Sequence, residues 1–167
     1  MSLYTGNGDS GYSSTIKRTN LLKSDLLFEL LGNLDELNVF LGGCKLVCIG
    51  DTKNFIEDIQ RDIMRISGCI AKESLDDEAY YIARVDVFER IMNKNPLNLS
   101  GFILPGISGY DYRFHLARVS ARKAERSLVL FSKSTSYIPF RVITFVQYLN
   151  RLSDLLFTFS IKRMIVL

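Results

Sequence analysis

The sequence has 167 residues, 47% hydrophobic and 23% charged, as expected of one globular domain large enough to bury a core. Its formal net charge of +3 is small, and acids are mixed with bases along most of the chain, which argues against a nucleic-acid-binding protein. No apolar run approaches the roughly 20 residues that cross a bilayer, and no signal peptide is recognised, so we expect a cytoplasmic protein with no membrane partner. A single histidine and three cysteines without a CxxC pair predict no protein-held metal site.

Residues 1–24 are predicted to form an ordered arm rather than a helix. The run from Thr5 to Gly11, TGNGDSG, contains three glycines, which let the backbone turn sharply and present N–H groups to a ligand. Hydroxyl groups and positive charges follow at Ser13, Ser14, Thr15, Lys17, Arg18 and Lys23. A plain turn or a flexible tail explains the glycines equally well, and no Walker A sequence is present, so a nucleotide-binding arm is one of two open interpretations.

Helical periodicity begins after the arm. Leucines from Leu26 to Leu41 recur at three- and four-residue spacing in a helix with Ser24 as predicted N-cap, and Gly42-Gly43 weakens its end. Further helices are expected over 52–72, about 81–93, 111–131 and, with Pro139 in the first turn, about 139–164. A polar linker is expected over 132–136. Five helices with no alternating strand pattern predict an all-α, antiparallel five-helix bundle, a single domain over 1–167 with the bundle at 25–167.

The predicted fourth helix carries a row of polar side chains. At about 100° per residue, an arc of roughly 100° contains His115, Arg118, Arg122, Glu125 and Arg126. The stretch 113–126 holds five Lys/Arg residues and one acid. These cations repel one another unless carboxylates, a partner subunit or phosphates meet them. For His115 itself, a hydrogen-bonded role within the bundle is the preferred interpretation over catalysis.

Five motifs occur in order along the chain: TGNGDSGYSS, LDELN, FILPG, HLARVSARKAER and NRLSD. Together they closely resemble the PduO-type ATP:corrinoid adenosyltransferases, from Tyr4 to about Asp154. The resemblance implies a ferritin-like five-helix bundle that assembles as a homotrimer, with active sites between subunits. It also implies transfer of the 5′-deoxyadenosyl group of ATP to the cobalt of reduced cobalamin, giving adenosylcobalamin and triphosphate, with Mg²⁺ accompanying the ATP.

The resemblance also assigns roles to residues. The expected ATP-binding set is Thr5, Gly6, Asn7, Gly8, Ser13, Ser14, Lys23, Arg122, Lys123, Glu125, Arg126 and Asn150. Arg118 and Asp35 match a salt bridge across the subunit interface, although an ion pair within one chain is an alternative. Phe102 matches an aromatic residue at the lower face of the corrin, whereas composition alone would place it in the core.

The sequence departs from the family pattern at four positions. Many members have Lys where this chain has Asn7 and Ser10, Ile107 replaces the second glycine of a common Pro-Gly-Gly, and Lys123 replaces an Arg. A lysine cannot make the bidentate contact of an arginine, so these changes bear on ATP affinity rather than on the reaction class.

A protein of another class would fit the same residues. The main alternative is a non-catalytic helical bundle that binds ATP or a corrinoid as a cofactor carrier or sensor. If the chain is the enzyme, a reductase that supplies electrons and an adenosylcobalamin-dependent mutase that takes the product would be its natural protein partners.

Overall fold

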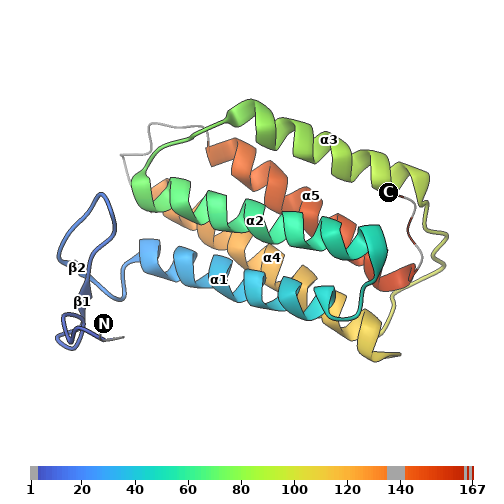
Figure 1. The fold of residues 1–167 in the computed structure, drawn as a ribbon, viewed down its shortest axis with the longest axis horizontal. Helices are drawn as coiled ribbons and strands as arrows, with labels where there is room; N and C mark the ends of the chain where they lie inside the picture. Colours follow the sequence, from blue (N-terminus) through green and yellow to red (C-terminus); the bar gives the residue numbers. More distant parts are fainter. Residues whose placement is uncertain (1–3, 135–141, 164, 166) are drawn as a thin grey trace.

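The computed structural model describes residues 4–134, 142–163, 165 and 167. Five helices form the bundle: α1 (Leu26–Lys45), α2 (Gly50–Lys72), α3 (Glu78–Lys94), α4 (Gly109–Ser134) and α5 (Val142–Ile161). Consecutive helices run in opposite directions, so that α3 and α5 run the same way (Figure 1). The predicted all-α five-helix architecture is therefore confirmed.

The core is built from the apolar rows that the sequence predicted. Helix α4 packs against both α1 and α5, while α1 also packs against α2 and α5 against α3. The leucine row of α1 and the isoleucine row of α2 face inwards and are buried at Leu27, Leu30, Leu34, Leu37, Leu41, Ile56, Ile59, Ile63, Ile66 and Ile70. Because α4 touches two neighbours, it has less surface left for solvent than a peripheral helix.

Several predicted helix boundaries are wrong by a few residues. The N-cap of α1 is Asp25, not Ser24, because the Asp25 side chain accepts a hydrogen bond from the Leu27 N–H at 2.8 Å. Helix α1 continues through Gly42-Gly43 to Lys45, and α4 includes residues 132–134 of the expected linker. The prediction for Pro139 and the rest of that linker lie outside the described residues.

The arm contains a short hairpin that the sequence did not reveal. Strand β1 (Tyr12–Ser13) pairs antiparallel with β2 (Leu21–Leu22), and the Lys23 N–H donates to the Gly11 carbonyl at 2.9 Å. Two-residue strands are too short for an alternating pattern to be recognised. The hairpin projects from the end of the bundle at which α1 begins (Figure 1).

A buried carboxylate ties three helices together. Asp62 on α2 is 1% exposed and accepts hydrogen bonds from Tyr80 and Arg84 on α3 and from Tyr148 on α5, the latter two at 2.7 and 2.8 Å. The Arg84 guanidinium also lies over the ring of Phe88, 5.4 Å from its centroid. A carboxylate with three donors has little left unsatisfied, so this charge is stable in the interior and fixes how α2, α3 and α5 meet.

Among the helices of the described residues, none combines the length and hydropathy that a membrane-spanning segment needs.

Candidate functional site

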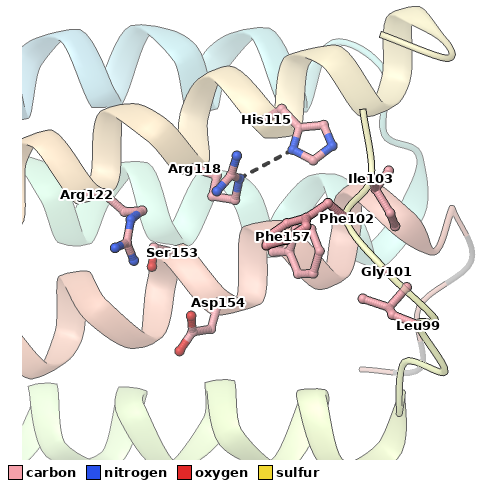
Figure 2. A pocket seen from close by; sticks show the side chains of 10 residues that line it. All are labelled: Leu99, Gly101, Phe102, Ile103, His115, Arg118, Arg122, Ser153, Asp154 and Phe157. Carbon is pink, nitrogen blue, oxygen red and sulfur yellow. Dashed lines mark hydrogen bonds between the residues drawn. The ribbon is translucent and has the colours of Figure 1, made fainter. Parts of the chain in front are cut away.

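A pocket of about 410 Å³ opens between α4, α5 and the segment 99–103 that precedes α4. Helix α4 contributes three residues that follow one another at spacings of three and four along one face, and α5 contributes a polar pair and a ring (Figure 2). The lining residues are Leu99, Gly101, Phe102, Ile103, His115, Arg118, Arg122, Ser153, Asp154 and Phe157. Arg118 and Arg122 are spaced one turn apart, so the helix itself directs two guanidinium groups to one cavity.

His115 lies deep in this pocket and is only 4% exposed. Its Nδ1 accepts a hydrogen bond from Arg118 Nε at 3.3 Å (Figure 2). Burial, assisted by the charge of Arg118, lowers the pKa of His115, so the ring is neutral at neutral pH. The expected role within the bundle fits this geometry, in which the imidazole holds Arg118 against α4.

Arg118 is held from a second side by an aromatic ring. Its guanidinium carbon lies 5.8 Å from the centroid of Phe157, the ring that α5 contributes to the pocket. The cation–π contact and the hydrogen bond to His115 together orient the guanidinium without neutralising it. The positive charge therefore stays available to an anion.

Phe102 is fully exposed at the mouth of the pocket, at 109% of the reference area. The core placement that composition suggested is therefore wrong. A phenylalanine ring with no protein cover is unfavourable in water, and one beside a cavity suits an apolar ligand.

Asp35 does not pair with Arg118 in this structure. Asp35 is exposed on α1, beside a small cavity between α1 and α2, and among the described residues neither side chain has the other as an ion-pair partner. The interpretation of Arg118 and Asp35 as an ion pair within one chain is therefore wrong. Their roles at a subunit interface stay a prediction.

The remaining predicted residues of α4 and α5 divide into two groups. Lys123 Nζ lies 2.7 Å from a carboxylate oxygen of Glu36, and Asn150 Nδ2 donates to Glu125 at 3.1 Å. Arg122 and Arg126, by contrast, are exposed, and no described carboxylate pairs with either. Among the predicted nucleotide-site residues of α4, the two arginines therefore have no described carboxylate partner, whereas Lys123 already has a counter-charge.

A second cavity, of about 470 Å³, lies within the arm. It is lined by backbone, hydroxyl and amide groups of Thr5, Asn7, Gly8, Ser10, Tyr12, Ser13, Ser14, Thr19 and Asn20. The structure thus brings together five of the predicted arm residues. Gly6 is not among the lining residues, but it takes a positive φ of 73° that turns the chain.

The side chain of Lys23 lies against the glycine-rich turn of the arm, beside Gly8. A Cβ on Gly8 would lie 2.9 Å from Lys23 Nζ, so only a glycine lets the ammonium group approach the backbone so closely. Within the described residues, Lys23 has no carboxylate partner. This places a free cation beside the glycine-rich turn, as the predicted role of Lys23 requires.

Within one chain, the arm and Phe102 lie at opposite ends of the helical bundle. The arm projects where α1 begins, and the segment joining α3 to α4, which carries Phe102, lies at the other end of the bundle (Figure 1). One chain therefore does not bring the arm cavity and the Phe102 end of the α4 pocket together.

Sequence reasoning missed the group that fixes the segment before α4. The Asp111 carboxylate accepts the N–H groups of Gly106 at 2.8 Å and Ile107 at 3.2 Å, and both the N–H and the hydroxyl of Ser108. Burial acts to raise the pKa of Asp111, but these donors outweigh it and lower the pKa to about 2. A serine three residues before an aspartate, and two residues after Pro-Gly, is the signal that could have indicated this turn.

Comparisons with known proteins identify relatives over nearly the whole chain. Residues 3–163 match the sequence profile of the family described as cobalamin adenosyltransferase. The corrinoid adenosyltransferase PduO of Citrobacter freundii is 33% identical over 96% of this chain, which spans 49% of that relative, about half its length. The corrinoid adenosyltransferase of Bacillus subtilis is 32% identical over 94% of this chain and 83% of its own length.

Solved structures of corrinoid adenosyltransferases are also similar to this chain. A phenylalanine-to-histidine variant of the PduO-type ATP:corrinoid adenosyltransferase from Lactobacillus reuteri, complexed with cobalamin and ATP, superposes with a TM-score of 0.78 at 26% identity, covering 95% of this chain and 89% of that one. An arginine-to-lysine variant complexed with ATP gives a TM-score of 0.75 at 27% identity, covering 95% and 91%.

The Asp111 turn makes a prediction about pH. Because the pKa of Asp111 is lowered in the folded protein, its contribution to stability is complete above the ordinary pKa of 3.8 and is lost as the pH falls towards about 2. We expect Asp111→Asn to lower the thermal midpoint at neutral pH and to lower it less below about pH 4. Thermal melts at neutral pH and below about pH 4 measure this difference. The control is Asp58→Asn, which changes an exposed aspartate of α2.

Hydrogen exchange locates the same effect. The amides of residues 106–108 should exchange faster in Asp111→Asn than in the parent protein, because they lose their acceptor. An equal loss of stability at both pH values, with unchanged exchange there, would show that Asp111 does not anchor the turn.

Proposed function

The chain belongs to the cobalamin adenosyltransferase family, and on this basis we propose that it transfers the 5′-deoxyadenosyl group of ATP to the cobalt of a reduced corrinoid, cob(I)alamin. The pocket between α4 and α5 supports this most directly, because it combines an exposed aromatic ring with two guanidinium groups. An apolar platform suits a flat macrocycle, and the arginines suit a polyphosphate. A cytoplasmic location is in keeping with three buried free thiols, at Cys44, Cys48 and Cys69.

The reaction is a displacement at the 5′ carbon of ATP. The electron pair of cobalt(I) forms the Co–C5′ bond, while the C5′–O bond breaks and its electrons leave on triphosphate. No proton is transferred, so no side chain has to act as an acid or base. The contribution of the protein is then to hold the two substrates in line and to stabilise charge on the leaving group.

The free cations match the charge that develops on the triphosphate. Arg122 and Arg126 are exposed on α4, and Lys23 lies against the glycine-rich turn, each without a described carboxylate partner. Backbone N–H groups of Gly6 and Gly8 would add neutral donors to the same anion. Lys123 contributes less to triphosphate binding than its position on α4 suggests, because Glu36 already neutralises its charge.

ATP is expected to enter as its Mg²⁺ complex. Among the described residues there is no group of three or more His, Cys, Asp or Glu side chains that could hold a metal ion. Phosphate oxygens and water would therefore provide most of the magnesium ligands, as in other nucleotide sites.

Phe102 is assigned to the corrin side of the reaction. Its ring is exposed at the pocket mouth, where it would lie beneath the macrocycle and exclude water and the lower axial ligand. Cobalt without a lower ligand receives less electron density, so cob(II)alamin is easier to reduce to cob(I)alamin. The protein needs no metal ligand of its own for this effect.

We further propose that the complete site forms between subunits of a homotrimer. The arm and Phe102 lie at opposite ends of one chain, and Asp35 and Arg118 do not pair within it. Near Asp35, the side chains of Val39 and Met64 are 67% and 65% exposed, which adds apolar surface of the kind that subunit contacts bury. In a trimer, Asp35 of one subunit would meet Arg118 of the next.

The proposed activity is tested by mixing the protein with ATP, Mg²⁺ and chemically reduced cobalamin. We expect the spectrum to convert to that of adenosylcobalamin over many turnovers, with triphosphate as the second product. A carrier or sensor would bind ATP or the corrinoid and stop at one equivalent, and that result would reject the enzyme in favour of the alternative.

Phe102→Ala separates corrin reduction from ATP binding. We expect a sharp loss of turnover when cob(II)alamin must be reduced on the protein, and a much smaller loss when cob(I)alamin is supplied ready-made. The Michaelis constant for ATP should change little, because the predicted ATP-binding residues lie on the arm, α4 and α5 and do not include Phe102. Equal activity of variant and parent with cob(II)alamin would remove Phe102 from the mechanism.

Asp35→Ala tests the subunit interface. We expect the parent protein to sediment as a trimer. The variant should form a weaker trimer, which dissociates at protein concentrations at which the parent stays assembled, because Arg118 loses its counter-charge at a desolvated contact. Asp58→Ala, on an exposed position of α2, serves as the control. A monomeric parent protein that is nevertheless active would refute the shared site.

A further inference from the structure

One ion pair connects the arm to the bundle. Arg18 lies in the loop between β1 and β2, and its Nε donates to a carboxylate oxygen of Glu73 at the end of α2. The Glu73 side chain is 6% exposed and that of Arg18 is 27% exposed, so solvent screens this pair far less than an ordinary surface pair. The two residues are 55 positions apart in the sequence, and the contact therefore fixes tertiary structure rather than a local turn.

The backbone of Glu73 supports a specific role for this residue. Glu73 is the C-cap of α2 and has φ 53° and ψ 42°, in the left-handed region. This position in helices usually holds glycine or asparagine, because a Cβ causes steric strain there. A glutamate at such a position is explained if its carboxylate is needed, and the pair with Arg18 provides that need.

The loop that carries Arg18 also forms a wall of the arm cavity. Thr19 and Asn20, which follow Arg18 directly, line that cavity together with Ser14. Within the loop, the Thr15 N–H donates to the Arg18 carbonyl at 2.8 Å and the Asn20 N–H donates to Ser14 Oγ at 3.2 Å. These bonds make the loop stiff, so anchoring the Arg18 side chain anchors the cavity wall.

We propose that the Arg18–Glu73 pair is a latch that positions the arm for the triphosphate of ATP, with both as positioning residues that do not touch the nucleotide. The inference rests on the proposed function of the arm. An arginine beside a phosphate-binding turn is the obvious candidate for a phosphate ligand, but the guanidinium of Arg18 is already neutralised by Glu73. With the ion pair intact, the arm keeps its backbone N–H groups and Lys23 in the positions that bind the triphosphate. Released, it has to be ordered again each time ATP binds.

Glu73→Gly is the decisive variant, because it breaks the latch and relieves the backbone strain together. We expect its thermal midpoint to be unchanged or higher, since glycine suits the left-handed C-cap. The dissociation constant and the Michaelis constant for ATP should nevertheless rise, by about tenfold if the unlatched arm is competent about a tenth of the time. The turnover number at saturating ATP and cob(I)alamin should change less than about twofold, since the docked arm is the same.

Arg18→Ala should reproduce this loss, and the double variant Arg18→Ala with Glu73→Gly should be no worse than either single variant. Lys72→Ala is the matched control, because it removes one positive charge next to Glu73 from an exposed side chain and leaves the pair intact. Hydrogen exchange of the amides of residues 12–22 gives a readout that does not depend on activity, and exchange should be faster in both latch variants.

Two results would overturn the latch. If Arg18→Ala weakens ATP binding and Glu73→Gly does not, Arg18 contacts the phosphates directly. If neither variant changes ATP binding or arm exchange, the arm is positioned by other contacts. A parent protein that fails to bind ATP or to make adenosylcobalamin would instead refute the proposed function, and the exchange measurement would still decide whether the pair anchors the arm.

Discussion

The packing of α4 between α1 and α5 is the constraint from which the site follows. Ala117, Ala121 and Ala124 are fully buried along one face, and their small side chains let the neighbouring helices approach closely. Once these alanines fix the rotation of α4 about its axis, the directions of Arg118 and Arg122 are fixed as well. The basic row is therefore held by the core, and its charge does not have to be balanced within the helix.

The helices could be predicted because burying an apolar row leaves a regular trace in the sequence. Their ends could not, and Gly42-Gly43 shows why. A Cβ at Gly42 would lie 3.3 Å from Gln60 Nε2 on α2, and one at Gly43 would lie 3.7 Å from Arg113 Nη1 on α4. Gly42 leaves room for the Gln60 side chain, whereas a Cβ at Gly43 would make an ordinary contact, and neither glycine ends the helix, so tertiary packing outweighs their low helix propensity. Local sequence has no information about which neighbour needs the space.

The same limit applies to the candidate site. The motifs contain most of the residues that line both cavities, but they did not reveal the partners of those residues. Lys123 meets Glu36 and Arg18 meets Glu73 only because distant segments pack together, and no periodicity records such pairs. The backbone of Glu73 gives the clearest example, since a glutamate at the end of a helical run is unremarkable in sequence and strained in the structure. The charges that matter for a polyphosphate are those left without such partners.

A division of labour along the bundle follows from these contacts. At one end, the latch and the hairpin hold a polar cavity of backbone and hydroxyl groups, which in the proposed reaction would bind the triphosphate largely through neutral donors. At the other end, Phe102 and the turn anchored by Asp111 present an apolar surface. In-line displacement requires the 5′ carbon of ATP and the cobalt to meet. If the arm of one subunit faces the α4 pocket of the next, assembly brings the two substrates together. A subunit alone would then bind ATP weakly and keep the polar and apolar halves of the reaction apart.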